Sequence, residues 1–141
     1  MTGPREFRET IEQINDEQGR VLAVILRTGV SPAETDFVTA PGENFQVGFI
    51  VYAANGVVQR HVHRPIARQL VGTSEVLVVR KGSCVVELFD DERRPVTSKE
   101  LRVGDVILLL AGGHGFRMLE DTVLLEVKQG PYTGLDEKER F

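Results

Sequence analysis

The sequence has few of the residues that define several common protein classes. It contains one Cys, no Trp and only three His among 141 residues. A single Cys excludes a disulfide framework within the chain and a zinc site built from cysteines, and it favours a reducing compartment. No apolar run approaches the roughly 20 residues of a membrane-spanning helix, and no basic, apolar-cored leader opens the chain. We therefore expect a cytoplasmic protein with no membrane partner.

An excess of basic residues is also missing. The formal net charge is -4, with 17 Lys and Arg against 21 Asp and Glu. Because nucleic-acid binders usually carry a basic face, this balance argues against a nucleic-acid partner. The chain is otherwise 41% apolar and 27% charged, as soluble globular chains are. Its length fits one domain, since domains run to roughly 100–200 residues.

Short apolar stretches separated by turn residues dominate the chain after residue 20. The predicted strands are Val21–Leu26, Phe45–Ala54, Val57–His63, Ser74–Arg80, Cys84–Phe89, Val96–Leu101, Val106–Leu110, Gly115–Leu119 and Thr122–Gln129. Strands this short and this closely spaced favour an all-β sandwich or barrel, which we place at residues 20–130. Cys84 lies in a valine-rich strand and is expected to be a small buried side chain.

The two ends of the chain have different patterns. Apolar residues three and four positions apart predict an amphipathic helix over Arg5–Asn15, within an N-terminal extension of residues 1–19. The last residues are mostly charged, which predicts a solvated tail over residues 131–141.

All three histidines fall in two short segments. His61 and His63 are two residues apart in a predicted strand, so their imidazoles point to the same face. Glu75 begins the next predicted strand on an otherwise apolar face, where a carboxylate needs a partner. His114 follows a two-glycine bend that can bring the chain back over the same end of the sheet. These four residues suit a divalent metal ion, without distinguishing Fe, Mn, Ni, Zn and Co.

The same residues resemble the two motifs of the cupin superfamily. The first motif pairs His-x-His with a Glu six residues before a Gly, as in His-Val-His at 61–63 and Glu-Val-Leu-Val-Val-Arg-Lys-Gly at 75–82. The second opens on Gly-Asp and reaches a His after a Gly-containing bend, as at 104–114. The resemblance covers roughly residues 45–129. It implies a double-stranded β-helix, or jelly roll, and a metal held by His61, His63, Glu75 and His114.

Two departures from the family pattern leave one role open. The proline common in the second motif is replaced by Leu110, and the gap between His63 and Glu75 is longer than usual. Glu75 is therefore either a metal ligand or a residue that orients one of the histidines.

A narrower resemblance implies a different chemistry. Arg-His-Val-His-Arg at 60–64 and Gly-Ser-Cys-Val-Val-Glu-Leu at 82–88 are similar to segments of the cupin sugar-nucleotide ketoisomerases. In that case His61 and His63 would be catalytic, moving protons between adjacent sugar carbons without a metal. A third alternative is a cupin that binds or senses a ligand without turnover.

The expected ligand is a small oxygenated molecule, sugar-derived or anionic, in an isomerase- or oxygenase-type reaction. Candidate substrate-binding residues are Arg60, Arg64, Arg68, Tyr52 and Phe116. The arginines either clamp an anionic group or line a solvated edge, and Tyr52 either reaches the cavity or packs in the core. Phe116 would form part of an apolar cavity wall. The exposed strand edges of a small jelly roll favour a homodimer.

The last predicted strand carries charge on one face only. Glu126 and Lys128 share that face, and the other face is aliphatic. Because one face must point outward, the charges favour the solvated orientation for Glu126 and Lys128. The alternative places the two side chains at the barrel mouth as an acid–base pair.

Overall fold

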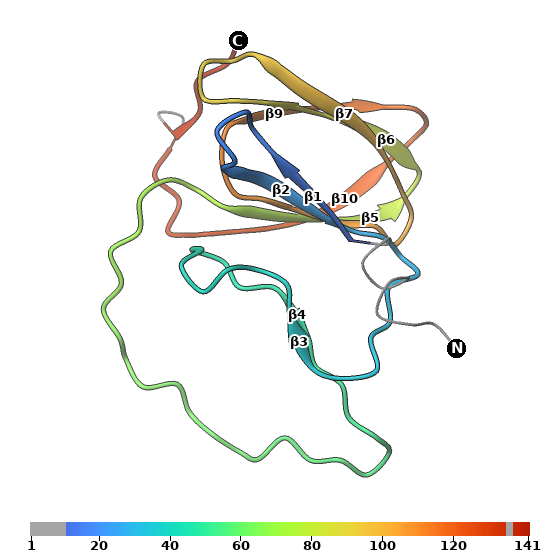
Figure 1. Ribbon diagram of the computed structural model, residues 1–141, viewed down its shortest axis with the longest axis vertical. Helices are drawn as coiled ribbons and strands as arrows, with labels where there is room; N and C mark the ends of the chain where they lie inside the picture. Colours follow the sequence, from blue (N-terminus) through green and yellow to red (C-terminus); the bar gives the residue numbers. More distant parts are fainter. Residues whose placement is uncertain (1–10, 135–136) are drawn as a thin grey trace. The chain divides into compact units, whose positions relative to one another are not determined.

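The computed structural model describes residues 11–134 and 137–141. Every element in these ranges is a β-strand, and the strands form three antiparallel sheets (Figure 1). The predicted all-β class is therefore confirmed, although the strand order of each sheet is linear and none closes into a barrel. No helix in the described ranges is long and apolar enough to cross a membrane. The chain divides into two units, of which the second is Ser31–Gly72.

The first unit contains a five-stranded and a three-stranded sheet. Across the five-stranded sheet the order is β1 (Ile11–Asn15), β2 (Val21–Leu26), β8 (Val106–Leu109), β5 (Glu75–Lys81) and β10 (Val123–Lys128). Across the three-stranded sheet it is β7 (Pro95–Arg102), β6 (Ser83–Phe89) and β9 (Gly113–Met118). The strands predicted in this unit form, with bounds that shift by a residue or two.

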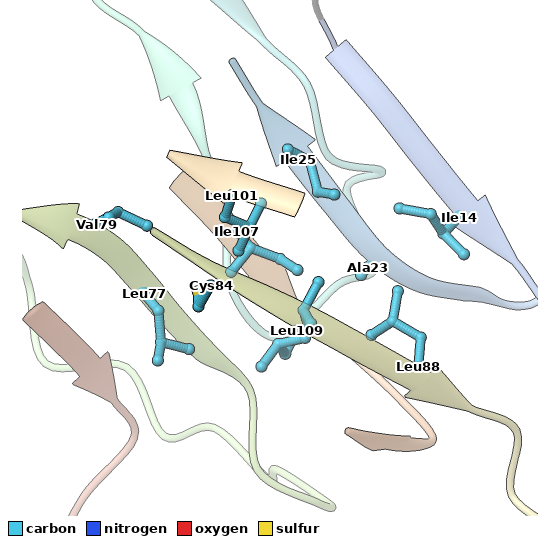
Figure 2. Close-up of a cluster of buried hydrophobic side chains, with 11 residues drawn as sticks. Ile14, Ala23, Ile25, Leu77, Val79, Cys84, Leu88, Leu101, Ile107 and Leu109 are labelled. Carbon is cyan, nitrogen blue, oxygen red and sulfur yellow. The ribbon is translucent and has the colours of Figure 1, made fainter. Parts of the chain in front are cut away.

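The core of the first unit lies between these two sheets. Ile25 and Leu77 from the five-stranded sheet point toward Leu88 from the three-stranded sheet (Figure 2). In β5 and β6 alternate residues enter this core, as expected when one face of a sheet is buried, whereas consecutive residues of β2 and β8 are buried. Cys84 belongs to the same cluster and is fully buried, as the valine-rich pattern predicted. Apolar burial between the sheets is the main force that holds the unit together.

The strand β1 occupies part of the segment for which the helical spacing predicted a helix over Arg5–Asn15. It pairs antiparallel with β2, and its Ile14 is buried in the core. Glu12 accepts a hydrogen bond of 2.7 Å from Nε of Arg27. The backbone ladder with β2 and this ion pair outweigh the weak helical preference of so short a segment. The helix prediction is therefore wrong for residues 11–15, and its remaining residues lie outside the described ranges.

Asp105, from the Gly-Asp pair of the second motif, directly precedes β8 and connects it to the turn after β2 and to the end of β7. Its Oδ1 accepts a hydrogen bond of 2.9 Å from the backbone N–H of Thr28. Its Oδ2 accepts one of 2.9 Å from the backbone N–H of Arg102 and one of 3.0 Å from Nη1 of Arg27. Since Asp105 is only 4% exposed, these bonds compensate for its burial. This part of the motif therefore has a structural role.

The described residues of the C-terminal tail are almost all exposed, as predicted for a solvated tail, yet the last of them contact the first unit. The ring of Phe141 lies edge-to-face with Phe89 at a centroid distance of 5.1 Å. The guanidinium of Arg93 lies 5.2 Å from the centroid of Phe141, and it pairs with Glu139 at 2.8 Å. The end of the tail is thus held beside the turn between β6 and β7.

The second unit contains one small sheet, formed by β3 (Asp36–Phe37) and β4 (Gly48–Phe49). The hydroxyl of Thr39, which is buried, donates to Oε1 of Gln46 and accepts from the backbone N–H of Val47, both at 3.1 Å. This hydrogen bonding closes the hairpin loop.

Two predicted strands fall in the second unit, and they fare differently. Of Phe45–Ala54, only the two residues of β4 are in a strand. The strand predicted over Val57–His63 does not form in this described unit, and every residue from 52 to 72 is exposed. A strand needs a neighbour for its backbone N–H and C=O groups, and within the unit the segment 57–63 has no such neighbour.

Candidate functional site

Glu75 and His114 come together from different sheets of the first unit. Glu75 begins β5 on the same face as the core residue Leu77, and it is 7% exposed. His114 is the second residue of β9, with 32% of its side chain exposed. The Nε2 atom of His114 lies 3.1 Å from Oε2 of Glu75. The structure thus brings two of the four predicted metal ligands into contact.

Gly112 sets the position of His114. Its φ is +70°, and a Cβ at this position would lie 2.2 Å from the carbonyl oxygen of Phe89. Glycine adopts this positive φ without strain, and it has no Cβ that would clash with the carbonyl oxygen of Phe89. The bend carries the chain from β8 in one sheet to β9 in the other, as the two-glycine pattern predicted.

The surroundings of Glu75 keep it ionised. The hydrogen bond with His114 lowers the pKa of Glu75, and this outweighs the burial that raises it. The charge of His114 and the side chains of Glu126 and Lys128 act in the same direction as the hydrogen bond. A carboxylate held in its charged form beside an imidazole suits either proton transfer or metal binding.

Glu126 and Lys128 lie near Glu75 on the face of β10 that turns toward the core, so the prediction that this face points outward is wrong. Glu126 is nevertheless exposed, as its charge predicted, and Lys128 is partly buried. In the antiparallel register Lys128 lies opposite Glu75, and Glu126 lies opposite Leu77. Leu124, on the same face, packs against the core. The other face holds three aliphatic side chains that are about half exposed, namely Val123, Leu125 and Val127. Glu75 is the residue from which the orientation of Glu126 and Lys128 could have been predicted. A carboxylate on an apolar face needs polar neighbours on the adjoining strand.

Gln129, which directly follows β10, is a partly buried polar residue that the sequence pattern did not single out. Its Oε1 accepts a hydrogen bond of 2.8 Å from the backbone N–H of Ser74, which precedes Glu75. Its Nε2 is buried and has no hydrogen-bond partner among the described residues. Leaving such a donor without a partner costs about 1–3 kcal/mol of folding free energy.

His61 and His63 belong to the second unit, so they do not share a unit with Glu75 and His114. Their ring centroids are 5.2 Å apart, at an angle of 69°. Nδ1 of His61 lies 2.8 Å from the carbonyl oxygen of Gln59. Because a carbonyl only accepts, Nδ1 carries the proton, and the neutral ring keeps its lone pair on Nε2.

The predicted substrate-binding residues are divided between the units. Arg60, Arg64, Arg68 and Tyr52 lie in the second unit, and all four are exposed. Phe116 lies in the first unit, where it packs against the core with its ring centroid 6.0 Å from that of His114. Phe116 is therefore an apolar neighbour of His114, and the substrate contacts of all five residues stay predictions.

Within residues 11–134 and 137–141, no group of three or more His, Cys, Asp and Glu side chains gathers in a way that could hold a metal ion. Comparison of the chain with protein-family models, curated proteins and solved structures finds no match. The resemblance to cupins therefore rests on the sequence motifs, and the Glu75–His114 contact is the part of the candidate site that the structure describes.

Proposed function

We propose that this protein is a cupin-type double-stranded β-helix that binds a divalent metal ion and a small oxygenated molecule. The observation that carries the proposal is the 3.1 Å contact between His114 and Glu75 at an otherwise apolar core. The other two ligands would be His61 and His63. A metal in such a site offers open positions where an oxygen atom binds and is polarised, which suits isomerase- or oxygenase-type chemistry.

The donor atoms fit such a metal. A carboxylate oxygen and imidazole nitrogens are the ligands used for divalent Fe, Mn, Ni, Zn and Co. The lowered pKa of Glu75 leaves it ionised at neutral pH, so it need not lose a proton before binding a cation. The hydrogen bond from Nδ1 of His61 to the carbonyl of Gln59 leaves Nε2 free, which is the usual arrangement of a metal-binding histidine.

Polar groups beside Glu75 support an oxygenated ligand. Lys128 lies opposite Glu75 and supplies a positive charge. Glu126 supplies a carboxylate on the same face of β10. Hydroxyl, carbonyl or carboxylate groups of a sugar-derived or anionic molecule would pair with such groups.

Elemental analysis tests this proposal. The protein is purified without chelator and without a polyhistidine tag, and its metal content is measured by mass spectrometry. We expect about one metal ion per chain, lost in His114→Ala and in the double variant His61→Ala/His63→Ala. Glu75→Gln should weaken binding by about 10–100-fold if Glu75 orients a histidine, and abolish binding if it is a ligand. Glu87→Gln, a matched change at an exposed position of β6, should bind normally. A wild-type protein that takes up none of the five metals would overturn the proposal.

A second candidate function is metal-independent acid–base catalysis by His61 and His63. It is favoured by the edge-to-face contact of the two rings, which holds two titratable groups side by side. One imidazole would take a proton from the hydroxyl-bearing carbon next to a keto group, and the keto oxygen would gain a proton to give an enediol. The other imidazole would deliver a proton to the former carbonyl carbon, while the hydroxyl of the first carbon loses its proton and becomes the new keto group.

The two functions differ in their response to chelation. In D₂O, acid–base catalysis predicts deuterium uptake into a nucleotide-linked keto-sugar that survives EDTA treatment. The uptake would be lost in His61→Ala and in His63→Ala but kept in His114→Ala. Loss of uptake on chelation would contradict the metal-independent mechanism. Ligand-induced thermal stabilisation without deuterium uptake would leave a binding or sensing role only.

A further inference from the structure

We infer that the C-terminal segment and the end of β10 form a binding site for a phosphate or phosphoryl group. The site lies entirely within the first unit, and its residues are Lys128, Tyr132, Gly134, Glu137, Lys138 and Arg140. Binding of the anion requires no metal ion. Only the further step, that the bound group belongs to the molecule that meets the metal, rests on the proposed function.

The six residues line a cavity of about 80 Å³. One water molecule needs roughly 10–15 Å³ of such space, so the cavity has room for several heavy atoms. Pockets that enclose a whole small molecule are larger, at about 300–1,000 Å³. The cavity therefore suits a small ion or one group of a ligand, with the rest of the ligand lying outside it.

The residues that line the cavity carry a positive net charge. Three cationic side chains, from Lys128, Lys138 and Arg140, lie around it with one carboxylate, from Glu137. The chain as a whole has a net charge of -4, so this local excess of cations does not follow from its composition. A cavity lined mainly by one sign of charge attracts ions of the opposite sign, so the ligand is an anion.

Two of the three cations are available to such an anion. Lys128 lies opposite Glu75, its charge lowers the pKa of Glu75, and Glu126 is two residues away on the same strand. These carboxylates offset the charge of Lys128. Among the residues that the structure describes, neither Lys138 nor Arg140 forms an ion pair with a carboxylate. The binding of an anion would therefore depend mainly on Lys138 and Arg140.

The chemistry of these side chains favours phosphate over carboxylate. The guanidinium of Arg140 can bind two oxygen atoms of an anion, and the ammonium of Lys138 can bind a third. The hydroxyl of Tyr132 is a further donor. A phosphoryl group carries a charge of about -1.5 to -2 and three acceptor oxygens, so it can pair with both cations at once. A carboxylate has one charge and two oxygens, which the arginine alone would satisfy.

Two contacts hold the C-terminal segment beside the candidate metal site. The hydroxyl of Thr73, two residues before Glu75, donates a hydrogen bond of 2.9 Å to Oε1 of Glu137. At the end of the chain, Cζ of Phe141 lies 2.8 Å from the position of a Cβ on Gly113, one residue before the histidine of the candidate site. The segment thus runs from the five-stranded to the three-stranded sheet (Figure 1). A ligand whose phosphoryl group fills the cavity would have its remaining atoms near Glu75.

Calorimetric titration with inorganic phosphate tests the anion site. The protein is treated with EDTA and dialysed, so that the result does not depend on a metal, and the ionic strength is kept near 0.01 M because salt screens exposed charges. We expect the wild type to bind phosphate and Lys138→Gln/Arg140→Gln to bind it at least about tenfold more weakly. Both side chains are exposed, so this variant should fold normally, which circular dichroism checks.

The double variant Arg80→Gln/Lys81→Gln is the matched control. It removes the same two charges from exposed positions at the end of β5 that is distant from Glu75. We expect it to change the affinity for phosphate by less than about twofold, since it leaves the cavity intact. Equal weakening in the two double variants would assign the binding to the general charge of the protein and overturn the inference. A wild type that does not bind phosphate overturns it as well.

Glucose 1-phosphate, with glucose as its control, identifies the source of the bound group. Binding at least about tenfold tighter than that of inorganic phosphate, and weakened in Lys138→Gln/Arg140→Gln, supports the phosphoryl group of a sugar. Equal affinity for glucose 1-phosphate and inorganic phosphate supports a site for free phosphate and contradicts a ligand shared with the metal.

The failure of this inference and the failure of the proposed function give different results. A protein that binds phosphate through Lys138 and Arg140 but takes up no metal supports the anion site and overturns the proposed function. A protein that takes up metal, while both double variants bind phosphate as the wild type does, overturns the anion site and leaves the proposed function standing.

Discussion

The imidazole of His114 donates its Nε2–H toward the carboxylate of Glu75 over 3.1 Å, although the two residues lie on strands of different sheets. Glu75 would otherwise be an almost buried charge on the face that also carries Leu77. Each residue thus offsets the cost of burying the other, and the contact links the two sheets at the open side of the core.

Removing His114 should raise the pKa of Glu75. The hydrogen bond with His114 is the main cause of the lowered pKa of Glu75. Without that bond, the effect of burial, which raises the pKa of Glu75, is less strongly opposed. We expect His114→Ala to shift the titration of the Glu75 carboxyl carbon to higher pH, followed by NMR in metal-free protein. His114→Gln, which keeps a hydrogen-bond donor, should shift it less. An unchanged titration in His114→Ala would show that the contact is not formed in solution.

Asp105→Ala should destabilise the fold by about 2–4 kcal/mol, because two backbone N–H groups and the guanidinium of Arg27 lose their acceptor. Asp105→Asn keeps one acceptor oxygen and should cost less. The measurement is urea unfolding followed by circular dichroism. Asp121→Ala, at an exposed position, should change the free energy of unfolding by less than about 0.5 kcal/mol. Equal values for Asp105→Ala and Asp121→Ala would contradict the connecting role.

Asp90 should make the protein sensitive to acid. Hydrogen bonding lowers the pKa of Asp90, first from the backbone of Arg94 and then from its side chain, and the backbone N–H of Glu92 adds to it. A carboxyl whose folded pKa lies below its unfolded value stabilises the fold above that unfolded value, about 3.9. This stability is lost as the pH falls below about 4 toward the folded pKa.

The thermal midpoint measured from pH 7 down to pH 3 checks this expectation for Asp90. Asp90→Asn keeps the Oδ1 acceptor of the turn and removes the charge, so its midpoint should fall less steeply below pH 4 than that of the wild type. Parallel curves for the two proteins would assign the acid sensitivity to other carboxylates.

Cys84 should resist thiol reagents in the native protein. It is fully buried in the core, and burial raises its pKa, so little thiolate forms near neutral pH. We expect its reaction with a disulfide reagent to be about 100-fold slower or more than in guanidinium-unfolded protein, because the core must open first. Rapid native labelling of one thiol per chain would place Cys84 outside the core.

The strands of the first unit were predictable because each satisfies a local rule. Val21–Leu26 is uniformly apolar, and the strand that contains Cys84 is bounded by turn residues, so pattern and structure agree. The bend before His114 was predictable for the same reason, since Gly112 has a backbone that only glycine adopts easily.

What the sequence did not predict depends on partners distant along the chain. Ile11 and Ile14 have helical spacing, yet the open side of β2 makes the segment a strand. Lys128 was expected in solvent because charge favours water, but its register opposite Glu75 turns it inward. Local sequence patterns do not determine which strands pair or in which register. Both predictions are wrong because the pairing of strands distant along the chain decides these features.

The anchored end of the chain has a practical consequence for handling the protein. The ring of Phe141 reaches the position that a Cβ of Gly113 would occupy, one residue before His114. A polyhistidine tag fused after Phe141 would begin next to the candidate site and supply imidazoles that compete for its metal. The metal content measured after purification through such a tag would therefore not be that of the protein's own site. A non-coordinating tag at the other end is preferable.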